Sequence, residues 1–137
     1  MRTIEFLVVH CTATPTNASI QAIQNYWKNE KKWENPGYHI LIDATGKIHS
    51  LLPIEQISNG VLGYNSVCLH VAYIGGLHDQ DTRTLAQKTA LLEVLTTWKK
   101  QFPKAKILGH RNFPKVQKAC PCFDAEQEYQ NLNYTLS

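Results

Sequence analysis

Long apolar runs, internal repeats and blocks of like charge are all missing from this sequence of 137 residues. The apolar stretch at residues 6–9 is too short for the core of a signal peptide, and no segment approaches the roughly 20 apolar residues of a membrane-spanning helix. We therefore expect cytoplasmic synthesis without membrane insertion. Basic residues exceed acidic ones by only three, 14 against 11, and they are scattered. Because a nucleic-acid-binding surface needs a stronger basic stripe, no nucleic-acid partner is expected.

Cysteine is sparse, with four residues at positions 11, 68, 120 and 122. In a chain without a secretion signal, thiols usually stay reduced, which favours metal binding or simple burial over disulfides. The hydrophobic fraction of 43% and the charged fraction of 18% are those of an ordinary globular protein. At this length we expect a single domain over residues 1–137.

Hydrophobic patterning predicts alternating strands and helices. We expect strands over residues 4–9, 38–43, 47–52, 67–74 and 106–109, and helices over residues 19–33 and 84–102, with a short helix after residue 124. The turn at residues 44–46 joins two of these strands as a hairpin. The other links contain helices, so the fold class is α/β: a mixed central sheet with helices packed on its faces.

The second long helix has the clearest sequence signals. Thr84 and Gln87 form a capping-box pattern at its start, and Pro103 follows its end. Its large apolar residues recur near one face, which we expect to be buried: Leu85, Leu92, Leu95, Trp98 and Phe102.

Two histidines each follow a predicted strand directly. His10 comes after the strand over residues 4–9, and His110 comes after the strand over residues 106–109. Strand ends place side chains on a rigid rim, and neutral imidazole is a good zinc ligand. We assign structural roles to the remaining histidines, which are His39, His49, His70 and His78.

The segment over residues 118–124 could supply a third ligand. A thiolate beside two histidines would complete a catalytic zinc site with an open fourth position. Residues two apart in extended chain lie roughly 6–7 Å apart, so Cys120 and Cys122 cannot both join such a site unless the chain turns sharply. The same geometry favours Lys118 and Cys120 on one face. Spacing alone does not select the cysteine, and a packed loop with two inert thiols stays equally open.

Several short motifs occur in an order that resembles a known family. They are VVHCTATP, NPGYHILID, GYNS, YIGG, GHRNF and KACPCFD, and together they run from about residue 4 to residue 124. This arrangement resembles the type 2 N-acetylmuramoyl-L-alanine amidases, which include phage amidase lysozymes and animal peptidoglycan recognition proteins. The CPCFD form is similar to amidases of Bacteroides-type bacteria and their prophages.

The resemblance implies a Zn²⁺ ion held by His10, His110 and Cys120. It implies catalytic roles for Tyr38 and Lys118, and it places Cys122 where relatives often carry serine. The implied reaction is hydrolysis of the amide bond between N-acetylmuramic acid and L-alanine in peptidoglycan or muropeptides. We expect a monomer that reaches the cell wall after release or export by another system.

Two other functions fit parts of the sequence. A non-catalytic peptidoglycan-binding module would have a similar pocket, but the matches to Tyr38, Lys118 and Cys120 favour an enzyme. A thiol hydrolase would use Cys120 or Cys122 with a histidine base. A zinc nucleobase deaminase fits poorly, because the HxE motif is missing and the cysteines are spaced CxC.

Overall fold

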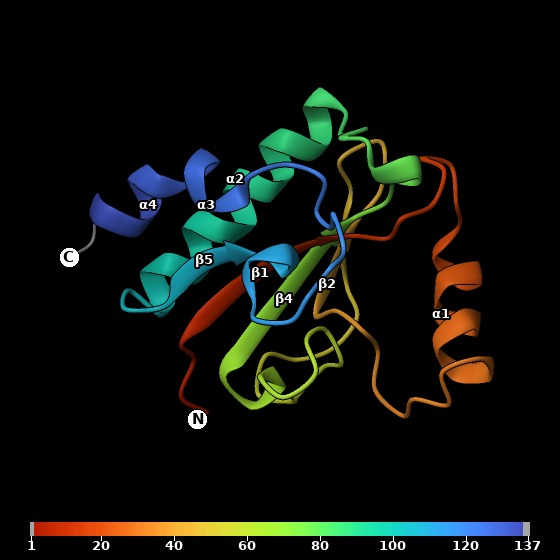
Figure 1. Ribbon diagram of the computed structural model, residues 1–137, viewed down its shortest axis with the longest axis horizontal. Helices are drawn as coiled ribbons and strands as arrows, with labels where there is room; N and C mark the ends of the chain where they lie inside the picture. Colours follow the sequence, from red (N-terminus) through yellow and green to blue (C-terminus); the bar gives the residue numbers. More distant parts are fainter. Residues whose placement is uncertain (1, 136–137) are drawn as a thin grey trace.

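The computed structural model describes residues 2–135 and is built around one five-stranded sheet with the order β3-β2-β4-β1-β5. Figure 1 shows β1 and β4 running side by side through the centre of the molecule. β1 pairs in parallel with both β4 and β5, and β2 pairs in parallel with β4. The strands are β1 (Phe6–Cys11), β2 (Ile40–Ile42), β3 (Ile48–Ser50), β4 (Cys68–Tyr73) and β5 (Lys106–Gly109).

The antiparallel β2–β3 pair is the predicted hairpin. Its turn is closed by Asp43, whose carboxylate accepts hydrogen bonds from the backbone N–H groups of Thr45 and Lys47. Gly46 has a φ of 86°, a left-handed conformation that favours glycine. One antiparallel pair on an otherwise parallel sheet makes the sheet mixed, so the predicted fold class is confirmed.

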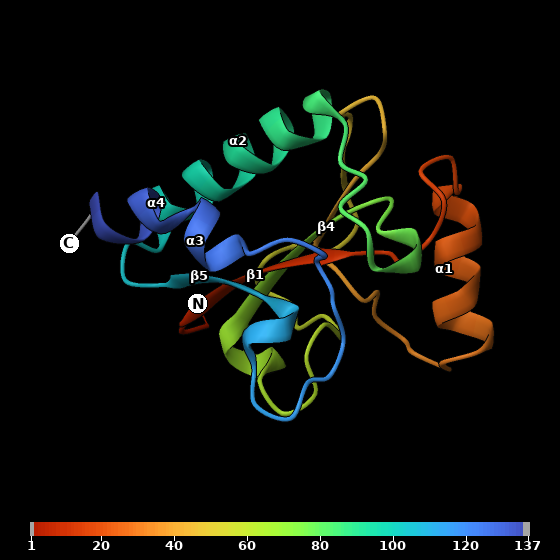
Figure 2. The same ribbon diagram turned by 45° about the horizontal axis from the view of Figure 1, so that its top comes forward.

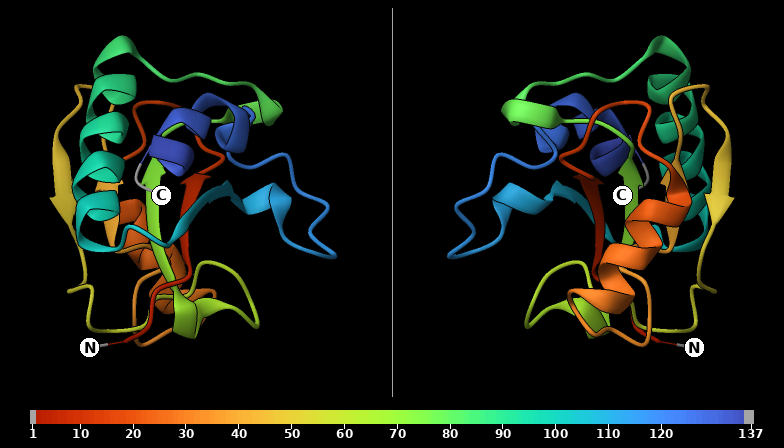
Figure 3. Two further views of the ribbon diagram at one scale, coloured as in Figure 1. Left: turned by 90° about the vertical axis from the view of Figure 1, so that its left-hand side faces the viewer. Right: turned by 90° about the vertical axis from the view of Figure 1, so that its right-hand side faces the viewer.

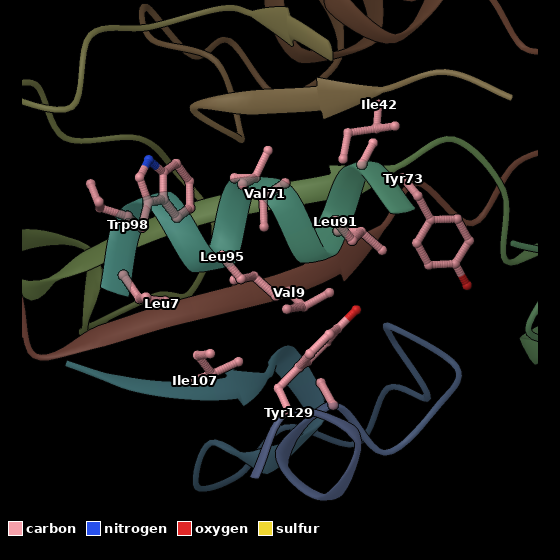
Figure 4. Packing of buried hydrophobic residues seen from close by; sticks show 14 of the residues in the cluster. Leu7, Val9, Ile42, Val71, Tyr73, Leu91, Leu95, Trp98, Ile107 and Tyr129 are labelled. Atoms are coloured by element: carbon pink, nitrogen blue, oxygen red, sulfur yellow. The ribbon is translucent and has the colours of Figure 1, made fainter. Parts of the chain in front are cut away.

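One face of the sheet packs against α2 (Leu85–Gln101). Figure 4 shows Leu91, Leu95 and Trp98 of this helix over the strand residues Leu7 and Val71. The predicted capping box is confirmed, because the Thr84 hydroxyl accepts from the N–H of Gln87 and the Gln87 side chain accepts from the N–H of Thr84. Figure 2 shows α3 (Ala125–Glu128) and α4 (Gln130–Thr135) lying beside α2 on this side of the sheet.

The opposite face packs against α1 (Ile20–Asn29), as the two views of Figure 3 show. Ile23 and Trp27 of α1 contact Leu41 and Ala72 of the sheet. Because side chains alternate along a strand, Leu7, Val9 and Cys11 face α2, while Val8 and His10 face the other way. β1 therefore directs His10 toward the α1 side of the molecule.

Two details differ from the sequence-based expectations. The helix over residues 19–33 ends earlier, at Asn29, because Lys32 adopts a left-handed φ of 59°. Leu95 and Trp98 of α2 are buried as expected, but Leu85 and Leu92 are 80% and 49% exposed, because the rest of the buried stripe runs through Ala90, Leu91 and Val94. No helix within residues 2–135 has both the length and the apolar character needed to cross a bilayer.

Candidate metal centre

Three side chains from distant parts of the sequence meet at one edge of the sheet. His10 lies within β1, whereas the sequence pattern predicts it just after the strand, because pairing with β4 continues to Cys11. His110 opens the short helix η3 (His110–Asn112), directly after β5 as expected. Cys120 comes from the loop before α3. One ligand atom from each of these residues lies within 4.8 Å of the other two.

The loop that carries Cys120 is fixed by hydrogen bonds to the sheet. Figure 2 shows this segment leaving the sheet after β5 and returning to α3. The backbone N–H of Arg111 donates to the carbonyl of Cys120 (2.9 Å), and the buried hydroxyl of Tyr73 donates to the carbonyl of Pro121 (2.7 Å). The N–H of Cys11 donates to the sulfur of Cys120 (3.1 Å). The thiol is thus held against the C-terminal end of β1, with its sulfur 3.9 Å from Nδ1 of His10.

Cys122 lies outside this cluster. Its backbone adopts a left-handed φ of 73°, which turns its side chain toward Cys11 and Gly76. Burial raises the pKa of Cys122 to about 12, which is the opposite of what a thiol nucleophile needs. Of the two candidate cysteines, Cys120 is therefore the one that the structure brings to the two histidines.

Both histidines of the cluster are held in the neutral form. Burial, aided by the nearby His70, His110 and Lys118, holds the pKa of His10 well below 6.5. Burial, with Lys118 adding to it, lowers the pKa of His110 to about 4. At neutral pH each ring therefore has one nitrogen with a free electron pair, which is the form that binds zinc.

Tyr38 and Lys118 lie at the same cluster. The ring of Tyr38 is 5.0 Å from that of His10, centroid to centroid, and its hydroxyl donates to the carbonyl of Cys11 (3.2 Å). Burial, with the nearby Cys120 and Cys11, raises the pKa of Tyr38 well above 10, so the phenol keeps its proton. Lys118 is exposed on the Cys120 loop and lines the same cavity as His10, His110 and Cys120.

A cavity of about 580 Å³ opens over the cluster and extends along α1. Tyr26, Trp27 and Trp33 also line the cavity, and Lys31 adds a second positive charge to its lining. The segment at Asn59 and Gly60 lines it as well. A concave site with apolar walls and a few polar groups at one place is typical of a site that binds a small ligand.

Two residues behind His10 were not predicted from the sequence. His70 is fully buried in β4, and its Nδ1 lies 2.8 Å from Nε2 of His10. Asn65 contacts the other nitrogen of His70 at 3.0 Å. Every residue of β4 is buried. A buried histidine needs hydrogen-bond partners, so a histidine inside a predicted strand was the signal that could have identified His70. The identity of the partner depends on the β1–β4 pairing, which joins residues about 60 positions apart in the chain.

Comparisons with known proteins agree with this arrangement. The family model described as N-acetylmuramoyl-L-alanine amidase matches residues 1–123. The endolysin of Enterobacteria phage K11 is 32% identical over 124 residues, which is 87% of this chain and 81% of the relative. Among solved structures, the endolysin of the Thermus scotoductus bacteriophage Ph2119 is 25% identical, with a TM-score of 0.82 over 97% of this chain and 86% of that one. The peptidoglycan recognition protein PGRP-SA of Apis mellifera shares the fold, at 19% identity and a TM-score of 0.76, over 96% of this chain and 84% of that one.

Proposed function

The chain belongs to the N-acetylmuramoyl-L-alanine amidase family and is an enzyme of that class, and on this premise we propose that it is a zinc-dependent hydrolase. Its substrate is peptidoglycan, and the bond cut is the amide between N-acetylmuramic acid and L-alanine. The observation that carries the proposal is the convergence of one ligand atom each from His10, His110 and Cys120.

The donor set fits zinc. Two imidazole nitrogens and one sulfur are ligands that zinc accepts, and three protein ligands are usual for a catalytic site. In a tetrahedral site, a nitrogen and a sulfur bound to the same zinc ion lie about 3.6 Å apart. Nδ1 of His10 and the sulfur of Cys120 are 3.9 Å apart, so only a small adjustment is needed. When bound, zinc supplies a Lewis acid for the substrate carbonyl and lowers the pKa of a water molecule to about 7.

Lys118 and Tyr38 would act on the charge and the protons of the reacting amide. The ammonium of Lys118 borders the cavity at the cluster and stabilises negative charge as it develops on the carbonyl oxygen. Tyr38 stays protonated beside His10, and its hydroxyl, on leaving the carbonyl of Cys11, would serve as a hydrogen-bond donor that orients the substrate or helps to move a proton.

The cavity along α1 would hold the peptide stem of the substrate. Its aromatic walls suit the apolar parts of a peptide, and Lys31 offers a positive partner for a carboxylate of the stem. The chain would reach this polymer in the cell wall after release or export by another system, and it would act as a monomer.

Metal analysis of matched cysteine variants tests the proposal. The purified wild type should contain about one zinc ion per chain, as three converging protein ligands imply. Cys120→Ser should lose the metal, and Cys122→Ser, two residues away and outside the cluster, should keep it. Loss of metal from Cys122→Ser with retention in Cys120→Ser would overturn the ligand assignment.

A further inference from the structure

His70 and His10 lie on the same face of the sheet. In the parallel β1–β4 pairing, His70 is opposite Val8 and His10 is opposite Ala72, so the two histidines are offset by two positions along the strands. Both are buried, with exposures of 0% and 1%. Their rings approach through one short contact of 2.8 Å, between Nε2 of His10 and Nδ1 of His70.

Asn65 determines which nitrogen of His70 carries the proton. The side-chain oxygen of Asn65 accepts hydrogen bonds from the N–H groups of Gly60 (3.1 Å) and Val61 (2.7 Å). Backbone N–H groups are donors only, so these two contacts fix the position of the amide oxygen. The same oxygen lies 3.0 Å from Nε2 of His70, and this nitrogen must therefore be the donor.

This assignment determines the proton positions on the other nitrogen of His70 and on both nitrogens of His10. The two ring nitrogens of His70 contact His10 and Asn65 and no carboxylate, so the buried ring is neutral and carries a single proton. With that proton on Nε2, Nδ1 is an acceptor, and Nε2 of His10 must donate to it. Nδ1 of His10 is then left with a free electron pair, and this is the nitrogen that faces Cys120.

The surroundings of His70 hold its ring in place. His39 stacks on it at 6.0 Å between centroids and 7° between planes, and Nδ1 of His39 accepts from the backbone N–H of His70. On another side, a Cβ added to Gly60 would lie only 2.3 Å from Nδ1 of His70. The ring therefore has little freedom to turn away from His10.

We infer that His70 is a positioning residue that holds His10 in the tautomer with Nδ1 free for the metal, through the hydrogen-bond chain from Asn65 to His70 to His10. The inference rests on the proposed zinc site. Groups that orient a metal-binding histidine in this way typically change metal affinity 10–100-fold when they are replaced.

Two substitutions of similar shape separate this role from a structural one. Asparagine and leucine have the same branched skeleton, but the amide oxygen of His70→Asn can take the place of Nδ1 as an acceptor, and His70→Leu offers none. We expect His70→Leu to weaken zinc binding by about 10–100-fold, and His70→Asn to recover most of that loss. A merely structural role would produce the opposite order, because leucine suits a buried position better.

Nitrogen-15 NMR of the metal-free protein gives a second readout that does not depend on activity. In the wild type, the proton of His10 should be on Nε2, and in His70→Leu a population with the proton on Nδ1 should appear. A wild-type protein with the proton on Nδ1, or equal zinc affinity in His70→Asn and His70→Leu, would overturn this inference alone. A wild type that binds no zinc at all would overturn the proposed function together with it.

Discussion

Gly60 packs against the ring of His70, and Gly60→Ala tests whether the loop that contains Gly60 controls the proposed metal centre. The added Cβ would lie 2.3 Å from Nδ1 of His70, while ordinary contact begins near 3.4 Å, so the ring or the loop must move by about 1.1 Å. A shift of this size is enough to lengthen the 2.8 Å contact with His10 beyond hydrogen-bond distance. We expect zinc affinity to fall by about 10–100-fold and the free energy of unfolding to fall by about 1–3 kcal/mol.

Gly63→Ala is the matched control in the same loop. Its Cβ would meet nothing within 4 Å, but its φ of 90° is costly for alanine. This variant should lose about 1 kcal/mol of stability and keep the wild-type zinc affinity. Competition with a chromophoric chelator measures the affinity, and urea unfolding of the metal-free protein measures the stability. Wild-type zinc affinity in a folded Gly60→Ala protein would refute the reasoning.

Three further predictions concern single side chains. Tyr38→Phe should keep zinc and lower kcat by about 10²–10⁴-fold, because it removes only the hydroxyl beside His10; wild-type kcat would contradict its role. Lys118→Met should lower kcat by about 10²–10³-fold with one zinc still bound, and a purely KM effect would exclude charge stabilisation. Burial lowers the pKa of His39 to about 4, so between pH 6.5 and 4 the unfolded chain binds a proton that the native protein does not. Stability of the metal-free protein should therefore fall as the pH drops through this window, by about 2 kcal/mol from His39 at pH 5, and His39→Asn should show a smaller decrease in urea unfolding.

Local signals in the sequence predicted most of the elements. The Thr84–Gln87 capping pattern, the turn at Gly46 and the short strand before His110 each depend on neighbouring residues, and the structure contains all three. The burial of α2 was predicted less well. Large side chains suggested a face through Leu85 and Leu92, whereas the packed stripe includes the smaller residues Ala90 and Val94.

The residues of the candidate site also differ in how well the sequence predicts them. The ordered motifs of the sequence point to His10, His110 and Cys120, because a family resemblance carries long-range information. The role inferred for His70 depends on the register of β4 against β1, which no local pattern fixes. The orientation of Asn65 depends in turn on the loop before it, because the N–H groups of Gly60 and Val61 donate to its side-chain oxygen.

Mass spectrometry of a digest of a defined muropeptide tests the central claim most directly. The zinc-loaded protein should release an intact stem peptide with a free amino group on L-alanine and leave the sugar with its lactyl carboxylate. Chelator treatment should stop the release, and added zinc should restore it. Full release by a chelator-treated protein shown to be free of metal, or cleavage at any other bond, would contradict the account.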